Sequence, residues 1–141
     1  MYALTCRYFD GGRLARTQFQ YTLQDADIDE LDMLSYHLYP INYGLTLPKD
    51  TQIWIERHQA IAAVTGKVAY LGECGFAAPD AERAQNYDAW MRHLFNLSGG
   101  QLGLFWQLSP AGRINNDGFA VYSRQDNATA WILGRWGKAI R

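Results

Sequence analysis

Glu73 is the residue in this sequence whose type and position are best suited to chemistry. It follows the apolar run of residues 68–71 and lies in the stretch K-V-A-Y-L-G-E-C-G-F, residues 67–76. That run predicts a buried strand. A carboxylate between glycines at the C-terminal end of such a strand suits a ligand site, because parallel α/β folds bind ligands there. Strand ends also carry solvated carboxylates, so Glu73 alone leaves both interpretations open.

Two further strands are predicted to end in residues that suit the same site. Residues 31–39 (L-D-M-L-S-Y-H-L-Y) form a strand closed by a proline, and alternation puts His37 and Tyr39 on one face. Residues 102–108 (L-G-L-F-W-Q-L) place Trp106 near the end of a third strand. A lone histidine is more often part of a core, and that alternative stays open for His37. Together, however, the three ends offer a carboxylate for an anomeric carbon, donors to orient it and an indole for stacking, which indicates a sugar site.

The elements that would position these residues alternate between strands and helices. Such alternation predicts an α/β fold with a parallel sheet and right-handed crossovers. Besides the strands above, the pattern predicts a possible strand at residues 1–9, helices at about residues 50–64, 80–97 and 127–140, and a short extended piece at residues 119–122.

The helical stripes assign several side chains to packing. His58 shares a stripe with Trp54 and Ile61 at helical spacing, so we interpret it as structural. Asp80 is expected to cap the second helix. Trp131 and Trp136 are expected to pack the last helix onto the rest of the chain.

Composition excludes several classes of protein. The 141 residues fit one domain, and 48% apolar residues with 19% charged residues are enough for a core. A formal net charge of −1 without a basic run gives no support for nucleic-acid binding. No apolar run of about 18 residues and no signal-peptide pattern occurs, so we expect no membrane span. No nucleotide-binding motif or metal-site spacing is present, so we expect no cofactor. Whether Cys6 and Cys74 pair is left open.

Three ordered motifs resemble a known family. The sequences H-L-Y-P (residues 37–40), Y-L-G-E (residues 70–73) and G-L-F-W-Q-L (residues 103–108) resemble the last three strands of glycoside hydrolase family 5, and most closely its endo-β-1,4-mannanases. The segment N-D-G-F-A-V-Y, residues 116–122, is similar to that group's end segment. The resemblance covers about residues 17–140 and leaves residues 1–16 unmatched.

The resemblance implies a retaining glycoside hydrolase on a (β/α)8 TIM barrel. Glu73 matches the catalytic nucleophile, and His37 and Tyr39 match the pair around the nucleophile and substrate. Trp106 matches the aromatic floor for the sugar at the cleavage point. Tyr43 falls where many mannanases have a tryptophan, and is a candidate substrate contact. The parent enzyme is expected to be secreted and to act on a polysaccharide, β-mannan or β-glucan.

The chain also departs from the family. A TIM barrel has about 250 residues, and the chain offers about strands 6–8 with their helices, an open C-terminal portion spanning residues 17–141. The general acid/base of the family has no match here. Asp117 is not a candidate for that role, because it lies in a loop and not at a strand end. We therefore expect a partial catalytic domain that needs the missing N-terminal half of the barrel or self-associates. The alternatives are an endoglucanase or other β-glycosidase of the same family, and an inactive half-barrel that binds carbohydrate or a partner protein.

Overall fold

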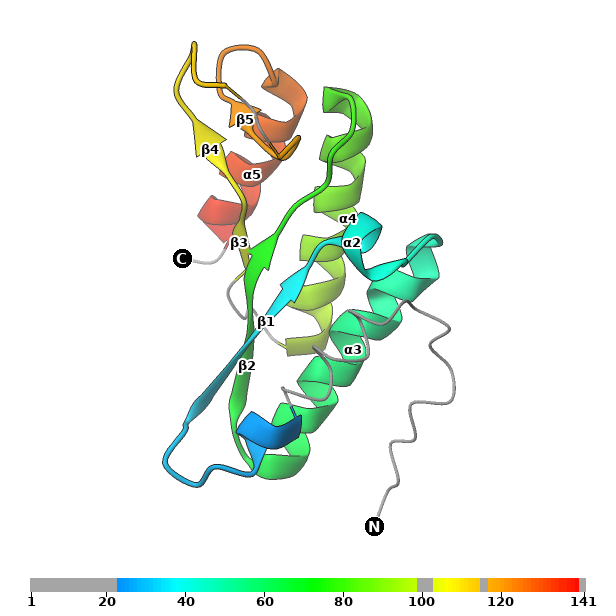
Figure 1. The fold of residues 1–141 in the computed structure, drawn as a ribbon, viewed down its shortest axis with the longest axis vertical. Coiled ribbons are helices and arrows are strands. Elements are labelled where there is room, and N and C mark those ends of the chain that lie inside the picture. Colours follow the sequence, from blue (N-terminus) through cyan, green and yellow to red (C-terminus); the bar gives the residue numbers. More distant parts are fainter. Residues whose placement is uncertain (1–22, 99–102, 115–116, 140–141) are drawn as a thin grey trace.

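The computed structural model describes residues 23–98, 103–114 and 117–139 (Figure 1). A helical turn at residues 23–26 precedes the first strand. The predicted strand at residues 1–9, the unmatched segment 1–16 and Cys6 lie outside the described residues. In chain order the remaining elements are β1 (Met33–Leu38), α2 (Pro40–Tyr43), α3 (Pro48–Thr65), β2 (Val68–Cys74), α4 (Asp80–Ser98), β3 (Gly103–Phe105), β4 (Leu108–Ser109), β5 (Val121–Tyr122) and α5 (Asn127–Ala139).

The strands form two small parallel sheets. One has the order β1-β2-β3 and the other pairs β4 with β5. The predicted alternation of parallel strands and helices is confirmed. No closed barrel is formed by the part of the chain that the structure describes, and β1 and β3 are the edges of their sheet.

The two faces of the β1-β2-β3 sheet differ in burial. Helices α3 and α4 run along one side of the sheet (Figure 1). The face turned to the core carries Leu34, Tyr36 and Leu71, each at most 2% exposed. On the opposite face Met33 is 55% exposed and Val68 45% exposed. The alternation predicted for residues 33–38 is therefore confirmed, and among the described residues the helices cover one face of the sheet.

Helix α3 contains the predicted structural histidine. Gly66 ends the helix in the left-handed region, at φ 71°, where a residue without a Cβ is favoured. His58 is fully buried, its Nδ1 lies 2.7 Å from the Trp54 carbonyl oxygen, and its ring stacks on Tyr36 at 4.5 Å. Burial lowers the His58 pKa to about 4, so the ring is neutral. The structural interpretation of His58 is confirmed.

Two expectations about α4 and α5 need correction. The carboxylate of Asp80 caps α5 rather than α4: its two oxygens accept the backbone N–H groups of Ala128 and Thr129, both at 2.9 Å. Partial burial alone would raise the pKa of Asp80, and these hydrogen bonds outweigh it and lower the pKa. Trp131 is 63% exposed, so its predicted packing role is wrong. Trp136 does pack between the helices, and its indole donates to Asp88 at 2.8 Å.

The predicted strand at residues 102–108 is broken, and the structure shows why. Trp106 N–H donates to the Cys74 carbonyl at 2.7 Å, which is the last bond of this segment to β2. The Trp106–Gln107 peptide bond is cis. The next carbonyl, that of Gln107, accepts from Val121 N–H at 2.8 Å, next to the β4–β5 pairing. The segment changes partner after Trp106, so alternation within one strand could not describe it.

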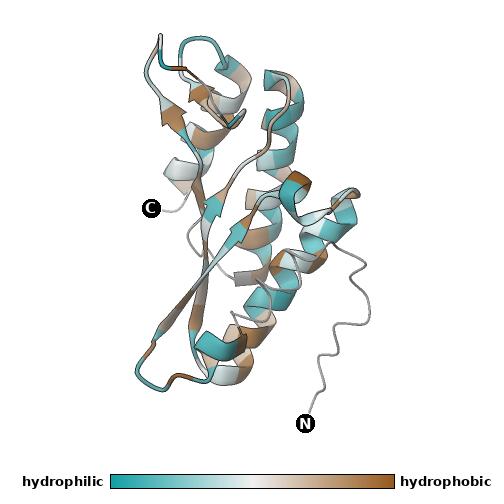
Figure 2. Ribbon diagram, in the orientation of Figure 1, coloured by the Kyte–Doolittle hydropathy of each residue, from teal (hydrophilic) through white to brown (hydrophobic). Residues whose placement is uncertain are grey.

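Hydropathy along the strands changes toward their C-terminal ends. In Figure 2 the arrowheads of β1 and β2 are hydrophilic, whereas the earlier parts of both strands are more hydrophobic. None of the helices in the described ranges combines the length and hydropathy needed to cross a membrane. The polar strand ends are where the candidate site residues lie.

Candidate active site

Glu73 is held by two side chains from β1 and the residue that follows it. The Tyr39 hydroxyl donates to Glu73 Oε2 at 2.7 Å, and His37 Nδ1 lies 3.5 Å from the same oxygen. The side chains of His37 and Glu73 are each 37% exposed. The structure therefore brings together the carboxylate and both of its predicted partners at one accessible strand end.

The register of the sheet explains this meeting. His37 is the partner of Glu73 across the parallel ladder, after an irregularity between Tyr36 and His37. Gly75 N–H donates to the Leu38 carbonyl at 3.0 Å and keeps the two strands together past Glu73. A Cβ on Gly75 would lie 2.6 Å from Tyr39 Cε1, so glycine is what lets the Tyr39 ring approach.

Tyr39 is a neutral hydrogen-bond donor. Burial, followed by the hydrogen bond and the negative charge of Glu73, raises its pKa above the ordinary value. The phenol therefore stays protonated throughout the neutral range and donates a hydrogen bond to the carboxylate.

Tyr43 lies behind Tyr39 instead of lining an open surface. Its ring meets Tyr39 edge-on at 6.4 Å and Trp54 at 5.2 Å, and it is only 7% exposed. The predicted direct substrate contact does not fit this position, because packing already covers the ring. Tyr43 supports Tyr39 from the core side.

Trp106 follows β3, next to the strand that carries Glu73. Its backbone is bonded to Cys74, the residue after Glu73, and its side chain is 40% exposed. The indole N–H donates to Asp117 Oδ2 at 2.9 Å. A partly exposed indole, fixed next to the strand that carries Glu73, suits a stacking platform for a sugar.

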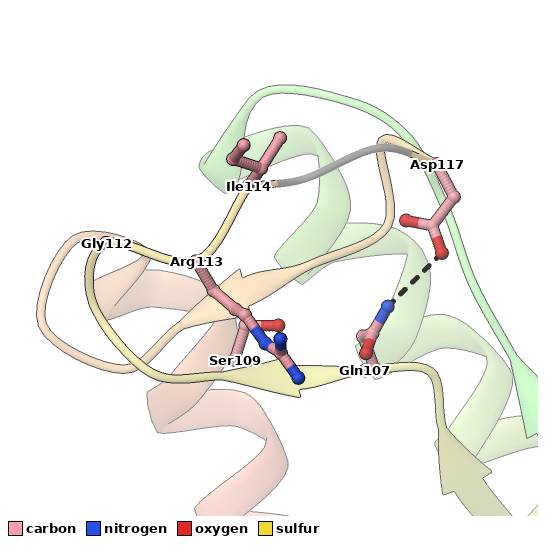
Figure 3. Close-up of a pocket in the computed structure, with 6 residues that line it drawn as sticks. All are labelled: Gln107, Ser109, Gly112, Arg113, Ile114 and Asp117. Atoms are coloured by element: carbon pink, nitrogen blue, oxygen red, sulfur yellow. Dashed lines mark hydrogen bonds between the residues drawn. The ribbon is translucent and has the colours of Figure 1, made fainter.

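A polar pocket of about 540 Å³ lies just beyond Trp106 (Figure 3). It is formed by β4 and the segment leading to β5, and Figure 3 shows the Gln107 amide pointing toward Asp117, which accepts from it at 3.2 Å. The lining residues are Gln107, Ser109, Gly112, Arg113, Ile114 and Asp117. The pocket thus adjoins the predicted stacking residue, although the sequence motifs did not indicate it.

Cys74 backs the site without taking part in it. Its side chain is fully buried, and Sγ lies 3.2 Å from the Leu104 carbonyl oxygen. Burial raises the pKa of the thiol, which keeps it protonated and unreactive. Within the described ranges no cluster of three or more His, Cys, Asp and Glu side chains could hold a metal ion.

With this geometry in place, comparison with known proteins gives a consistent result. The chain is 31% identical over 115 residues to mannan endo-1,4-beta-mannosidase A of Podospora anserina, a match that covers 78% of this chain and 30% of the relative. It is 30% identical over 108 residues to the probable mannan endo-1,4-beta-mannosidase F of Emericella nidulans, over 74% of this chain and 24% of the relative. This chain is similar to part of a β-mannanase.

Solved mannanase structures agree with the sequence relatives. The endo-beta-1,4-mannanase from Thermotoga petrophila matches with a TM-score of 0.72 and 26% identity, over 84% of this chain and 28% of its own. The endo-1,4-beta-mannanase from Rhizomucor miehei shares the fold, with a TM-score of 0.64 at 22% identity over 80% of this chain and 32% of its own. No protein-family model matches the sequence.

These comparisons confirm the resemblance to endo-β-1,4-mannanases, which are glycoside hydrolases. They also set its extent, because the chain spans less than a third of the two curated relatives it matches. The roles of His37, Tyr39, Glu73 and Trp106 remain predictions that the geometry can support.

Proposed function

We propose that this chain carries the nucleophile side of a retaining β-mannanase-like active site, with Glu73 as nucleophile. The observation that carries the proposal is the 2.7 Å hydrogen bond from Tyr39 to Glu73 Oε2 at a strand end, with His37 beside the same oxygen. The similarity to mannan endo-1,4-beta-mannosidases supports β-1,4-mannosidic bonds as the substrate.

Each residue then has a chemical task. A Glu73 oxygen attacks the anomeric carbon, the bond to the leaving oxygen breaks, and that oxygen takes a proton from a general acid. Water then attacks the same carbon and gives its proton to the conjugate base of that acid, and the bond to Glu73 breaks and releases the sugar. Tyr39 and His37 hold Oε2, while Oε1 has no hydrogen-bond partner among the described residues and is available to attack. Trp106 supports the sugar ring at the cleavage point.

The general acid would come from outside this chain. A retaining pair requires two carboxyl groups about 5–5.5 Å apart. The contacts of Glu73 within the described ranges are a phenol and an imidazole. We propose that β1, β2 and β3 correspond to strands six to eight of a family 5 (β/α)8 barrel, and that the earlier strands bring the acid.

The sheet face opposite the helices, which carries exposed apolar side chains, supports the proposal that further barrel strands pack against it. Met33, Val68 and Leu104 are 55%, 45% and 46% exposed on this face, and β1 and β3 are open edges. In a closed barrel such side chains fill the interior and the edges pair with further strands. The remaining barrel is the occupant we propose, and a second copy of the chain is the alternative.

A direct test joins this chain to the rest of a mannanase. In the Podospora anserina enzyme, the segment matching this chain is replaced by residues 23–141, and release of reducing ends from galactomannan and from carboxymethylcellulose is compared. We expect hydrolysis of galactomannan and little of the cellulose derivative. Preferential cleavage of cellulose would instead support the endoglucanase alternative.

Binding without hydrolysis is the second candidate, because the contacts of Glu73 with the described residues include no second carboxyl. Here the 141-residue chain alone is titrated with mannohexaose, and the folded state of the chimera is checked by circular dichroism. Binding of mannohexaose by the chain, together with a folded chimera that hydrolyses neither polymer, would favour the binding role and contradict the enzyme proposal.

A further inference from the structure

We propose that the turn at residues 117–119 is a positioning element of the site: Asp117 fixes the indole of Trp106, and Phe119 supports the ring of Tyr39. The inference rests on the proposed function, because it matters to catalysis only if Trp106 and Tyr39 meet the sugar. It gives a task to a segment that neither the motifs nor the relatives' names assign.

Asp117 gathers three donors. Its Oδ2 accepts from the Trp106 indole at 2.9 Å and from the Gln107 amide at 3.2 Å, and its Oδ1 accepts the Phe119 backbone N–H at 3.0 Å. The hydrogen bond from Phe119, followed by that from Trp106, lowers the pKa of Asp117, so the carboxylate is charged near neutral pH. An indole has one N–H in the plane of its ring, so this bond limits rotation of the exposed Trp106 ring.

The other end of the turn reaches the residue that donates to Glu73. The Phe119 ring packs on Tyr39 with centroids 5.1 Å apart, and only 9% of Phe119 is exposed. Both rings meet over Gly75, where an added Cβ would lie 3.0 Å from Phe119 Cδ1. One short turn therefore contacts the platform and the tyrosine on either side of Glu73.

The turn lies close to the segment that follows β2. Gly118 has φ of 80°, and a Cβ there would lie 3.1 Å from Cβ of Ala77, in the segment that follows β2. A side chain at this position would be strained by the backbone and crowded by Ala77. Glycine at this position therefore lets the turn with Asp117 and Phe119 lie close to the segment that follows β2.

The protein contains a matched pair for comparison. The Trp136 indole donates to Asp88 Oδ1 at 2.8 Å, between α4 and α5. Asp88 also pairs with Arg92 and Arg135, and this cluster joins two helices away from the strand ends. Asp88→Asn is therefore the control for losing an indole-bound carboxylate without touching the proposed site.

The first arm of the test needs no sugar. Indole N–H signals of the five tryptophans are recorded by ¹H–¹⁵N NMR on the 141-residue chain, with Trp106 assigned through Trp106→Phe. We expect Asp117→Ala, and more weakly Asp117→Asn, to move the Trp106 signal upfield and leave that of Trp136 in place. Asp88→Asn should do the reverse. An unchanged Trp106 signal in Asp117→Ala would overturn the inference.

The second arm measures mannohexaose binding. We expect Asp117→Asn to raise Kd about twofold to tenfold, the usual effect of losing one hydrogen bond. In a Trp106→Phe background, which lacks the indole N–H, the same change should have no further effect. Equal weakening in both backgrounds would contradict positioning through Trp106. Failure of the unchanged chain to bind mannohexaose would count against the proposed function, while the indole signals decide separately whether Asp117 holds Trp106.

Discussion

Tyr36 and His37 are neighbours in β1, but they lie in opposite environments. Tyr36 faces the helices, is 1% exposed and stacks on the buried His58. His37 faces away from them, is 37% exposed in its side chain and lies beside Glu73. One strand thus turns Tyr36 to the core, where it stacks on His58 of α3, and places His37 at the candidate site.

The two faces of β1 therefore have different tasks: the covered face stabilises the fold, and the open face can bind a ligand. On the covered face, burial removes the charge of His58 and leaves packing as its task. On the open face, polar groups keep access to solvent and hydrogen-bond each other at the strand ends. The following predictions test this division, beginning with the largest expected effect.

Replacing Glu73 by Gln in the chimera should lower galactomannan hydrolysis by at least ~10³-fold, because an amide cannot act as the nucleophile. Initial rates on galactomannan measure the change. Glu56→Gln is the matched control, since Glu56 is a half-exposed helix residue that pairs with His93. Equal losses in the two variants would indicate a fault in folding and contradict the special role of Glu73.

Leu71→Ala should lower the free energy of unfolding by about 2–5 kcal/mol, because Leu71 is fully buried on the covered face. Val68→Ala, on the open face of the same strand, should change it by no more than about 0.5 kcal/mol. Urea unfolding of the chain measures both. If Val68→Ala costs as much as Leu71→Ala, the open face is covered in solution, as self-association would do.

Acidification should destabilise the chain through His58. The folded pKa is about 4 and the unfolded value about 6.5, so between these pH values the unfolded chain takes up a proton that the folded chain does not. Stability is therefore retained above about pH 6.5, and about 3 kcal/mol is lost as the pH falls toward 4. Urea unfolding against pH should show this slope in the unchanged chain and in His37→Gln, but not in His58→Gln.

Tyr39→Phe should slow galactomannan hydrolysis by the chimera about tenfold to a hundredfold, the effect of one hydrogen bond to a charged group. Packing is retained, because Phe keeps the ring that meets Phe119 and Tyr43. Rates within twofold of the unchanged chimera would show that the Tyr39–Glu73 bond has no part in catalysis.

Much of the fold could be predicted from the sequence because it depends on local patterns. Alternation placed His37 and Tyr39 on one face of β1, and helical spacing placed His58 in the core. The meeting of His37, Tyr39 and Glu73 followed from parallel strands ending at one edge of a sheet.

The parts that could not be predicted depend on contacts between distant residues. Asp80 has the sequence position of a cap for α4, yet its carboxylate reaches α5, nearly fifty residues later. Residues 102–108 look like one strand, but the hydrogen-bonding partner changes after Trp106. Tyr43 was predicted from a position in a motif, which says nothing of the ring packed over it. The sequence placed Asp117 in a loop, but gave no sign that its carboxylate would meet Trp106.

Covalent trapping of Glu73 tests the central claim most directly. The chain and the chimera are incubated with 2-deoxy-2-fluoro-β-mannosyl fluoride, in which fluoride leaves without needing a proton, so a general acid is not required for attack on the anomeric carbon. Mass spectrometry of peptides should find one fluoromannosyl group on Glu73, formed in the chimera and absent from its Glu73→Gln variant. A label on another residue, or equal labelling of the Glu73→Gln variant, would contradict Glu73 as the nucleophile.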